Sequence, residues 1–168
     1  DKMKISDGIY VHRGFYLQLL DENVIRQIEK IMLNSPKDYK WIFCGHSAGG
    51  AHSIITSYFL AKKYPHRNIS TYTFASPRVG NMNFAESFGG LNNLNHWRVT
   101  YRNDIFTAIP IINYHHVGHS MRLYPDKFYI GEYVKWFTFS LIKCNSLFDH
   151  HTSFYTKELA KIINNSLN

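Results

Sequence analysis

Short apolar runs alternate with longer segments of helical periodicity along most of this chain of 168 residues, and no other feature constrains its fold as strongly. Residues 15–33, for example, place apolar side chains at spacings of three and four, which predicts one amphipathic helix. This stripe consists of Leu17, Leu20, Val24, Ile28 and Ile31. Strands that alternate with helices in this way lie parallel in one sheet and are joined by helical crossovers.

The alternation predicts a single α/β domain over residues 1–168. The composition agrees, because 45% hydrophobic and 18% charged residues can form a buried core, and the length fits one domain. The sheet is therefore expected to be mostly parallel. We expect strands at 9–12, 41–44, 69–75 and 96–101, helices at 15–33, 48–64, 81–88 and 152–163, and a hairpin of 121–124 with 127–130.

The apolar run 41–44 leads straight into the letters G-H-S-A-G, and a helix is expected directly afterwards. This spacing matches the G-x-S-x-G nucleophile elbow of α/β-hydrolases. In such a turn the serine is strained and exposed, and we expect a side chain at Gly45 or Gly49 to collide with a neighbouring strand or helix. The N–H of Ala48 can point at a developing oxyanion. The motif therefore predicts Ser47 as a nucleophile.

A serine nucleophile needs a base, and in this fold class the chain order is serine, then acid, then histidine. Asp104 follows the strand expected at 96–101, at the carboxyl end where reactive groups of parallel sheets gather. His150 and His151 lie in a loop before the last helix. We take Asp104 as the orienting acid and His150 as the base, with His151 as the alternative base. Without a catalytic role, Asp104 would be a turn-forming aspartate, and the two histidines would be a structural pair.

Other classes of function find less support. His115, His116 and His119 cluster, but no H-E-x-x-H or C-x-x-C motif accompanies them, so we expect neither a metal nor a cofactor. The net charge of +7 comes from scattered lysines and arginines, which indicates a basic surface compatible with anionic lipid rather than a nucleic-acid stripe. No apolar run reaches the length of a membrane-spanning helix.

The two cysteines, Cys44 and Cys144, do not make a disulfide framework. We expect both to be free thiols without a catalytic role, and Cys44 to be buried in its strand. The chain begins with Asp1 rather than methionine, and the sequence gives no indication of localisation.

Several longer blocks resemble one family, the class 3 or fungal-type triacylglycerol lipases, over nearly the whole chain. The stretch 11–15 reads V-H-R-G-F and resembles the family's H-x-G-F block. The stretch 45–51 resembles G-H-S-L-G-G-A with Ala48 in place of leucine, and 74–81 resembles F-G-S-P-R-V-G-N with Ala75 in place of glycine. The remaining blocks are R-V-x-x-x-x-D at 98–104 followed by Pro110, H-x-G at 116–118, and Asp149-His150 with Tyr155 beyond.

This resemblance implies an α/β-hydrolase fold and a Ser47, Asp104 and His150 triad that hydrolyses lipid esters, at a lipid interface, through an acyl-enzyme. It makes His46 a motif residue rather than a base, and the block at 76–78 structural. In the family, strands, a lid helix and a second oxyanion donor precede the H-x-G-F block. We therefore expect roughly a hundred further residues at the amino end, in the same chain or an associated one. The alternatives are an inactive lipid- or partner-binding domain and an acyltransferase that uses the same triad.

Overall fold

The main sheet has five strands in the order β3-β4-β5-β6-β7 in the computed structural model, which describes residues 1–125, 127–131 and 146–166. The first four strands are parallel, and β7 pairs antiparallel with β6 as the expected hairpin. The prediction of a mostly parallel sheet is thereby confirmed. The strands are β3 (Trp41–His46), β4 (Ile69–Phe74), β5 (Leu94–Tyr101), β6 (His119–Tyr124) and β7 (Lys127–Gly131).

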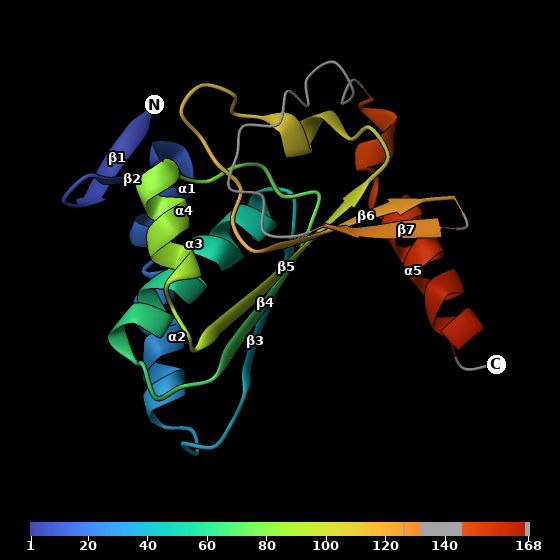
Figure 1. Cartoon of the computed structure of the whole chain (residues 1–168). Coiled ribbons are helices and arrows are strands. Elements are labelled where there is room, and N and C mark those ends of the chain that lie inside the picture. The colour runs from blue at the N-terminus through green and yellow to red at the C-terminus, as the bar shows by residue number, and fades with distance from the viewer. Residues whose placement is uncertain (126, 132–145, 167–168) are drawn as a thin grey trace.

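Helices cover both faces of this sheet (Figure 1). One side carries α1 (Arg13–Asp21), α2 (Val24–Leu33), α3 (Ala48–Lys63) and α4 (Met82–Gly89), and the other carries α5 (Thr152–Ser166). A separate antiparallel pair, β1 (Lys2–Ser6) and β2 (Ile9–His12), lies beside α1 and α4. The chain also forms two short 3-10 turns. The first, η1 (Ile105–Ala108), follows the carboxyl end of β5, and the second, η2 (Phe148–His150), precedes α5.

The single helix expected at 15–33 is wrong. The chain breaks between α1 and α2 at Asn23, whose φ of 53° places it in the left-handed region, a conformation that asparagine tolerates better than most residues. The break interrupts the helical register, so the predicted apolar stripe does not form one buried face. Leu20 and Ile31 are exposed, and Leu19 and Met32 are buried instead.

Two layers of apolar side chains hold the helices to the sheet. Ile54, Ile55 and Tyr58 of α3 are buried as expected, in a cluster shared with α1 and α4. On the opposite face, Tyr155 of α5 packs with Tyr101 of β5 in a second buried apolar cluster. The carboxyl end of β3, where α3 begins, and the carboxyl end of β5 thus lie at the same edge of the sheet, one on each side of β4.

The expected burial of Cys44 is also wrong, because its side chain is exposed. Successive side chains of a strand point to opposite faces. The helix α5 packs mainly against β5 and β6, and it reaches β3 through the ring contact of Tyr155 with His46 at the end of that strand. The edge strand β3 therefore leaves Cys44 and Ile42 uncovered, and Ile42 is 60% exposed. Cys144 lies outside the described residues. No helix within the described ranges has both the length and the apolar character to cross a membrane.

Candidate active site

Ser47 occupies the sharp turn between β3 and α3. Its φ of 55° and ψ of −124° place it in a strained region for a residue with a side chain. Its N–H donates a hydrogen bond of 2.9 Å to the carbonyl of Phe74, which anchors the turn to the end of β4. This backbone leaves the hydroxyl at the carboxyl end of the parallel strands, as in a nucleophile elbow.

The glycines of the turn differ from the prediction in which of them has no room for a side chain. A Cβ on Gly45 would lie 2.3 Å from the carbonyl oxygen of Gly49, so the expected collision is present there. A Cβ on Gly49 would meet nothing within 4 Å, which contradicts the expectation for that residue. The second tight position is Gly50, where a Cβ would lie 2.8 Å from the Cβ of Ser76. The reason is that Gly50, and not Gly49, faces the segment after β4.

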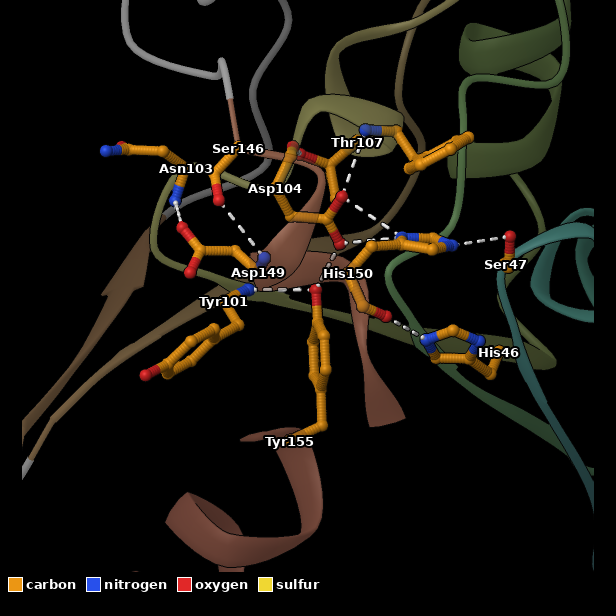
Figure 2. Close-up of polar contacts among 11 residues, drawn as sticks. His46, Ser47, Tyr101, Asn103, Asp104, Thr107, Ser146, Asp149, His150 and Tyr155 are labelled. Atoms are coloured by element: carbon orange, nitrogen blue, oxygen red, sulfur yellow. Dashed lines mark hydrogen bonds and ion pairs between the residues drawn. The ribbon is translucent and has the colours of Figure 1, made fainter. Parts of the chain in front are cut away.

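The structure brings Ser47, His150 and Asp104 into one hydrogen-bonded chain (Figure 2). The Oγ of Ser47 lies 2.9 Å from Nε2 of His150. The Nδ1 of His150 lies 3.0 Å from Oδ2 and 3.1 Å from Oδ1 of Asp104, which is completely buried. Because Nδ1–H donates to the carboxylate, Nε2 carries the lone pair that can accept the serine proton.

His151 takes no part in this chain. Its Nδ1 contacts the Oγ of Ser153 at 2.9 Å, and its side chain is exposed at the start of α5. Of the two histidines left open by the sequence, His150 is the one that lies within hydrogen-bonding distance of Ser47. Asp149 helps to place η2, because its Oδ2 accepts a hydrogen bond of 3.2 Å from the N–H of Asn103.

Tyr155 supports the carboxylate from below. Its hydroxyl donates to Oδ2 of Asp104 at 2.7 Å and accepts from the N–H of Tyr101 at 3.0 Å. Burial, followed by the charge of Asp104, raises the pKa of Tyr155 well above its usual value, so the hydroxyl remains a donor. The N–H of Phe106 donates to Oδ1 at 3.0 Å. The sequence located Tyr155 only as part of the resemblance, since nothing local shows where a tyrosine on a helix points.

His46 holds the backbone of His150. Its Nε2 lies 3.0 Å from the carbonyl oxygen of His150, and the two rings are 4.8 Å apart. Burial lowers the pKa of His46, which favours the neutral ring that donates one N–H to this carbonyl. This contact could not be predicted from the sequence, because His46 and His150 are far apart along the chain.

The histidine cluster at 115–119 does not gather around a common point that a metal would occupy. His116 donates from Nε2 to the carbonyl of Thr107 at 2.7 Å, and the Thr107 hydroxyl donates to the carbonyl of Asp104 at 2.7 Å. Burial lowers the pKa of His116 well below its usual value, which keeps the ring neutral. His116 therefore stabilises the loop that carries Asp104. Across the described ranges, no three histidine, cysteine, aspartate or glutamate side chains form a metal-binding group.

Ala48 is the first residue of α3, and its side chain is exposed beside Ser47. The first N–H groups of an α-helix have no partner within the helix and carry the positive end of its dipole. Such a group adjacent to a nucleophile is suited to receive a developing negative charge.

The fold and the site together define an α/β-hydrolase. The sheet is mostly parallel, the serine lies on a strand-to-helix turn, and a histidine and a buried aspartate lie within hydrogen-bonding distance along the chain of contacts. The sequence model of the class 3 lipase family matches residues 1–114. The chain therefore belongs to the class 3 lipase family.

Curated relatives match part of the chain. The toxin TseL of Vibrio cholerae is 34% identical over 105 residues, which cover 62% of this chain and 15% of that protein. The secreted mono- and diacylglycerol lipase A of Penicillium cyclopium is 29% identical over 119 residues, which cover 68% of this chain and 37% of that lipase. The chain thus spans well under half the length of these relatives.

Solved structures of lipases match a larger share of this chain than the curated relatives do. Lipase II from Rhizopus niveus superimposes with a TM-score of 0.75 at 24% identity, covering 89% of this chain and 61% of that one. The lipase from Rhizopus microsporus var. chinensis gives a TM-score of 0.73 at 25% identity, with 89% and 56% covered. The α/β fold, with its five-stranded sheet, is therefore that of fungal lipases.

Proposed function

We propose that residues 1–168 form the catalytic core of a serine hydrolase that cleaves lipid esters. The hydrogen-bonded chain from Ser47 through His150 to Asp104 is the observation that carries this proposal. Its support lies in the geometry, because a strained serine, an oriented imidazole and a buried carboxylate occupy the positions that nucleophilic ester cleavage requires.

In the proposed reaction, Nε2 of His150 takes the proton of Ser47 as Oγ attacks the ester carbonyl carbon. The resulting oxyanion accepts a hydrogen bond from the N–H of Ala48. His150 then gives the proton to the departing alcohol, which leaves an acyl group on Ser47. Water attacks this acyl-enzyme with His150 again as base, and the fatty acid is released. Asp104 holds the imidazole tautomer and stabilises its positive form throughout.

The lipid ester class is supported by the family and by the side chains around His150. Relatives carry the names of mono- and diacylglycerol lipase and of phospholipase A1. Leu147 and Phe148 directly precede the site and are 67% and 84% exposed, so two adjacent large apolar side chains face solvent beside it. Such a rim is suited to contact with apolar acyl chains or a lipid surface.

The decisive test combines a covalent probe with ester hydrolysis in the full-length protein. A fluorophosphonate should label the wild type but not Ser47→Ala, because only an activated serine attacks phosphorus. His150→Ala should lose orders of magnitude in turnover, whereas His151→Ala should retain most of it. Unchanged labelling in Ser47→Ala, with unchanged circular dichroism, would exclude the assignment. Binding without labelling would indicate a lipid-binding domain, and ester formation with added alcohol would indicate an acyltransferase.

A further inference from the structure

A groove opens between the α1–α2 pair and the last turns of α3. Its volume is about 540 Å³, within the range of small-molecule sites in proteins. The helix α3 has 16 residues, which corresponds to roughly 24 Å of α-helix. Because Ser47 lies before the first turn of α3, this groove is separate from the proposed active site.

The walls of the groove are mainly apolar and aromatic. Tyr16 and Phe59 stack with ring centroids 5.5 Å apart, and the nearly buried Leu19 and Leu60 continue the lining. Leu20, which the predicted helical stripe would have buried, is instead 46% exposed at this groove. The groove thus offers apolar surface to a ligand without a change in the core.

The helix break contributes to the lining. Asn23, the left-handed residue between α1 and α2, lies in the groove, and Ile25 of the first turn of α2 does so as well. The link between the two helices is thus part of the lining of the groove.

The charges at the groove are unbalanced toward the positive. Arg26 of α2 and Lys62 and Lys63 of α3 line it, together with a single carboxylate, Glu29. Lys63 forms an ion pair with Glu29, and this contact lowers the pKa of Glu29 so that the two charges neutralise each other. Lys62 contacts the Tyr58 hydroxyl and ring. Within the described residues, neither Arg26 nor Lys62 has a salt-bridge partner, so two positive charges remain on facing helices.

We propose that this groove binds one long-chain carboxylate, a fatty acid anion. Its hydrocarbon chain would lie against Tyr16, Leu20 and Phe59, and its carboxylate between Arg26 and Lys62. Apolar walls alone would accept any hydrophobic ligand, and the two cations alone would accept any anion. Only an amphiphile with an anionic head uses both. The proposed reaction at Ser47 would release this class of molecule, but the groove and its charges do not depend on that reaction.

The test measures dodecanoate binding to the full-length protein by titration calorimetry, below the critical micelle concentration. Wild type should bind dodecanoate in this groove, and the affinity should fall about tenfold or more in Arg26→Glu/Lys62→Glu, since hydrogen bonds to charged groups are among the stronger ones. Lys30→Glu provides the matched control, because it reverses an exposed cation on α2 that does not line the groove. Its affinity should match the wild type. Leu20→Asn should weaken dodecanoate binding without unfolding the chain.

Two further ligands separate the contributions of chain and charge. Butanoate has the carboxylate without the chain, and decanol has a chain without the charge, so both should bind more weakly than dodecanoate. The proposal is overturned if butanoate binds as tightly as dodecanoate. It is also overturned if Arg26→Glu/Lys62→Glu binds dodecanoate with the affinity of the wild type. Hydrolysis of a short soluble ester by the same variants should be unchanged, which distinguishes a failure of this groove from a failure of the Ser47 assignment.

Discussion

Ala48 contributes one backbone N–H to the proposed chemistry, and its methyl group is not required for it. The N–H belongs to the first residue of α3, next to Ser47, where helical N–H groups lack intrahelical partners. Side-chain substitution leaves this group in place, so the contribution of the N–H has to be tested in the backbone itself.

We predict that an amide-to-ester replacement at residue 48, with lactate in place of Ala48, lowers kcat about a hundredfold or more. KM should change little, because the oxyanion exists only in the transition state and intermediate. The measurement is steady-state hydrolysis of a soluble ester. Lactate in place of Ala61, near the other end of α3, removes a backbone N–H that is far from Ser47 and is bonded within the helix, so it should lower stability while kcat stays unchanged. Equal kcat values for the 48-ester and the wild type would assign the oxyanion donor elsewhere.

At the scale of elements, the packing of α3 against the segment after β4 depends on one of two adjacent glycines. Gly50 lies against Ser76, whereas Gly49 has open space around the position of a Cβ. Both residues are in the first turn of the same helix, so their intrinsic helical preferences are comparable and only the tertiary contact separates them.

Gly49→Ala should therefore stabilise the fold by about 0.5–1 kcal/mol, the usual preference of a helix for alanine over glycine. Gly50→Ala should destabilise it by about 1–3 kcal/mol, because the added methyl forces the helix away from Ser76. Urea unfolding midpoints of the two variants measure this difference directly. If Gly50→Ala is as stable as Gly49→Ala, the close approach of α3 at Gly50 is not present.

For the molecule as a whole, acid stability depends on histidines that are buried in the neutral form. His96 of β5 is 2% exposed and lies within 2.9 Å of the Thr73 hydroxyl. Burial, with a smaller contribution from the charge of Arg98, lowers the pKa of His96 to about 3. In the unfolded chain the pKa is about 6.5. Between these values the unfolded chain binds a proton that the folded chain does not, so stability falls as the pH decreases from about 6.5 toward 3.

We predict that the free energy of unfolding decreases by up to about 1.4 kcal/mol per pH unit below pH 6 through His96, and that His116 adds to the loss in the same direction. His96→Gln retains a polar group for Thr73 and removes the titration, so its stability should depend less steeply on pH. Urea unfolding at pH 7, 6 and 5 measures both curves. If the curves for the variant and the wild type are parallel, folding does not lower the pKa of His96.

Local features of the sequence were enough to predict the alternation of strands and helices, the mostly parallel sheet and the position of the serine turn. These follow from local periodicity and from the glycine spacing around Ser47, which do not require knowledge of distant contacts. Asp104 could be selected because its place after a strand already puts it at the reactive edge of a parallel sheet.

The remaining features depend on contacts between segments that are distant in the chain. His150 and His151 are adjacent in sequence, and only the packing of η2 against η1, with Tyr155 and His46 as supports, turns His150 toward Ser47. The break at Asn23 was missed because one left-handed residue leaves the apolar spacing unchanged. Burial of Gly50 rather than Gly49, and exposure of Cys44, depend on which neighbour covers each face. Periodicity predicts that a residue lies on a helix or strand, whereas the direction of a side chain and its partner are set by packing between segments distant in the chain.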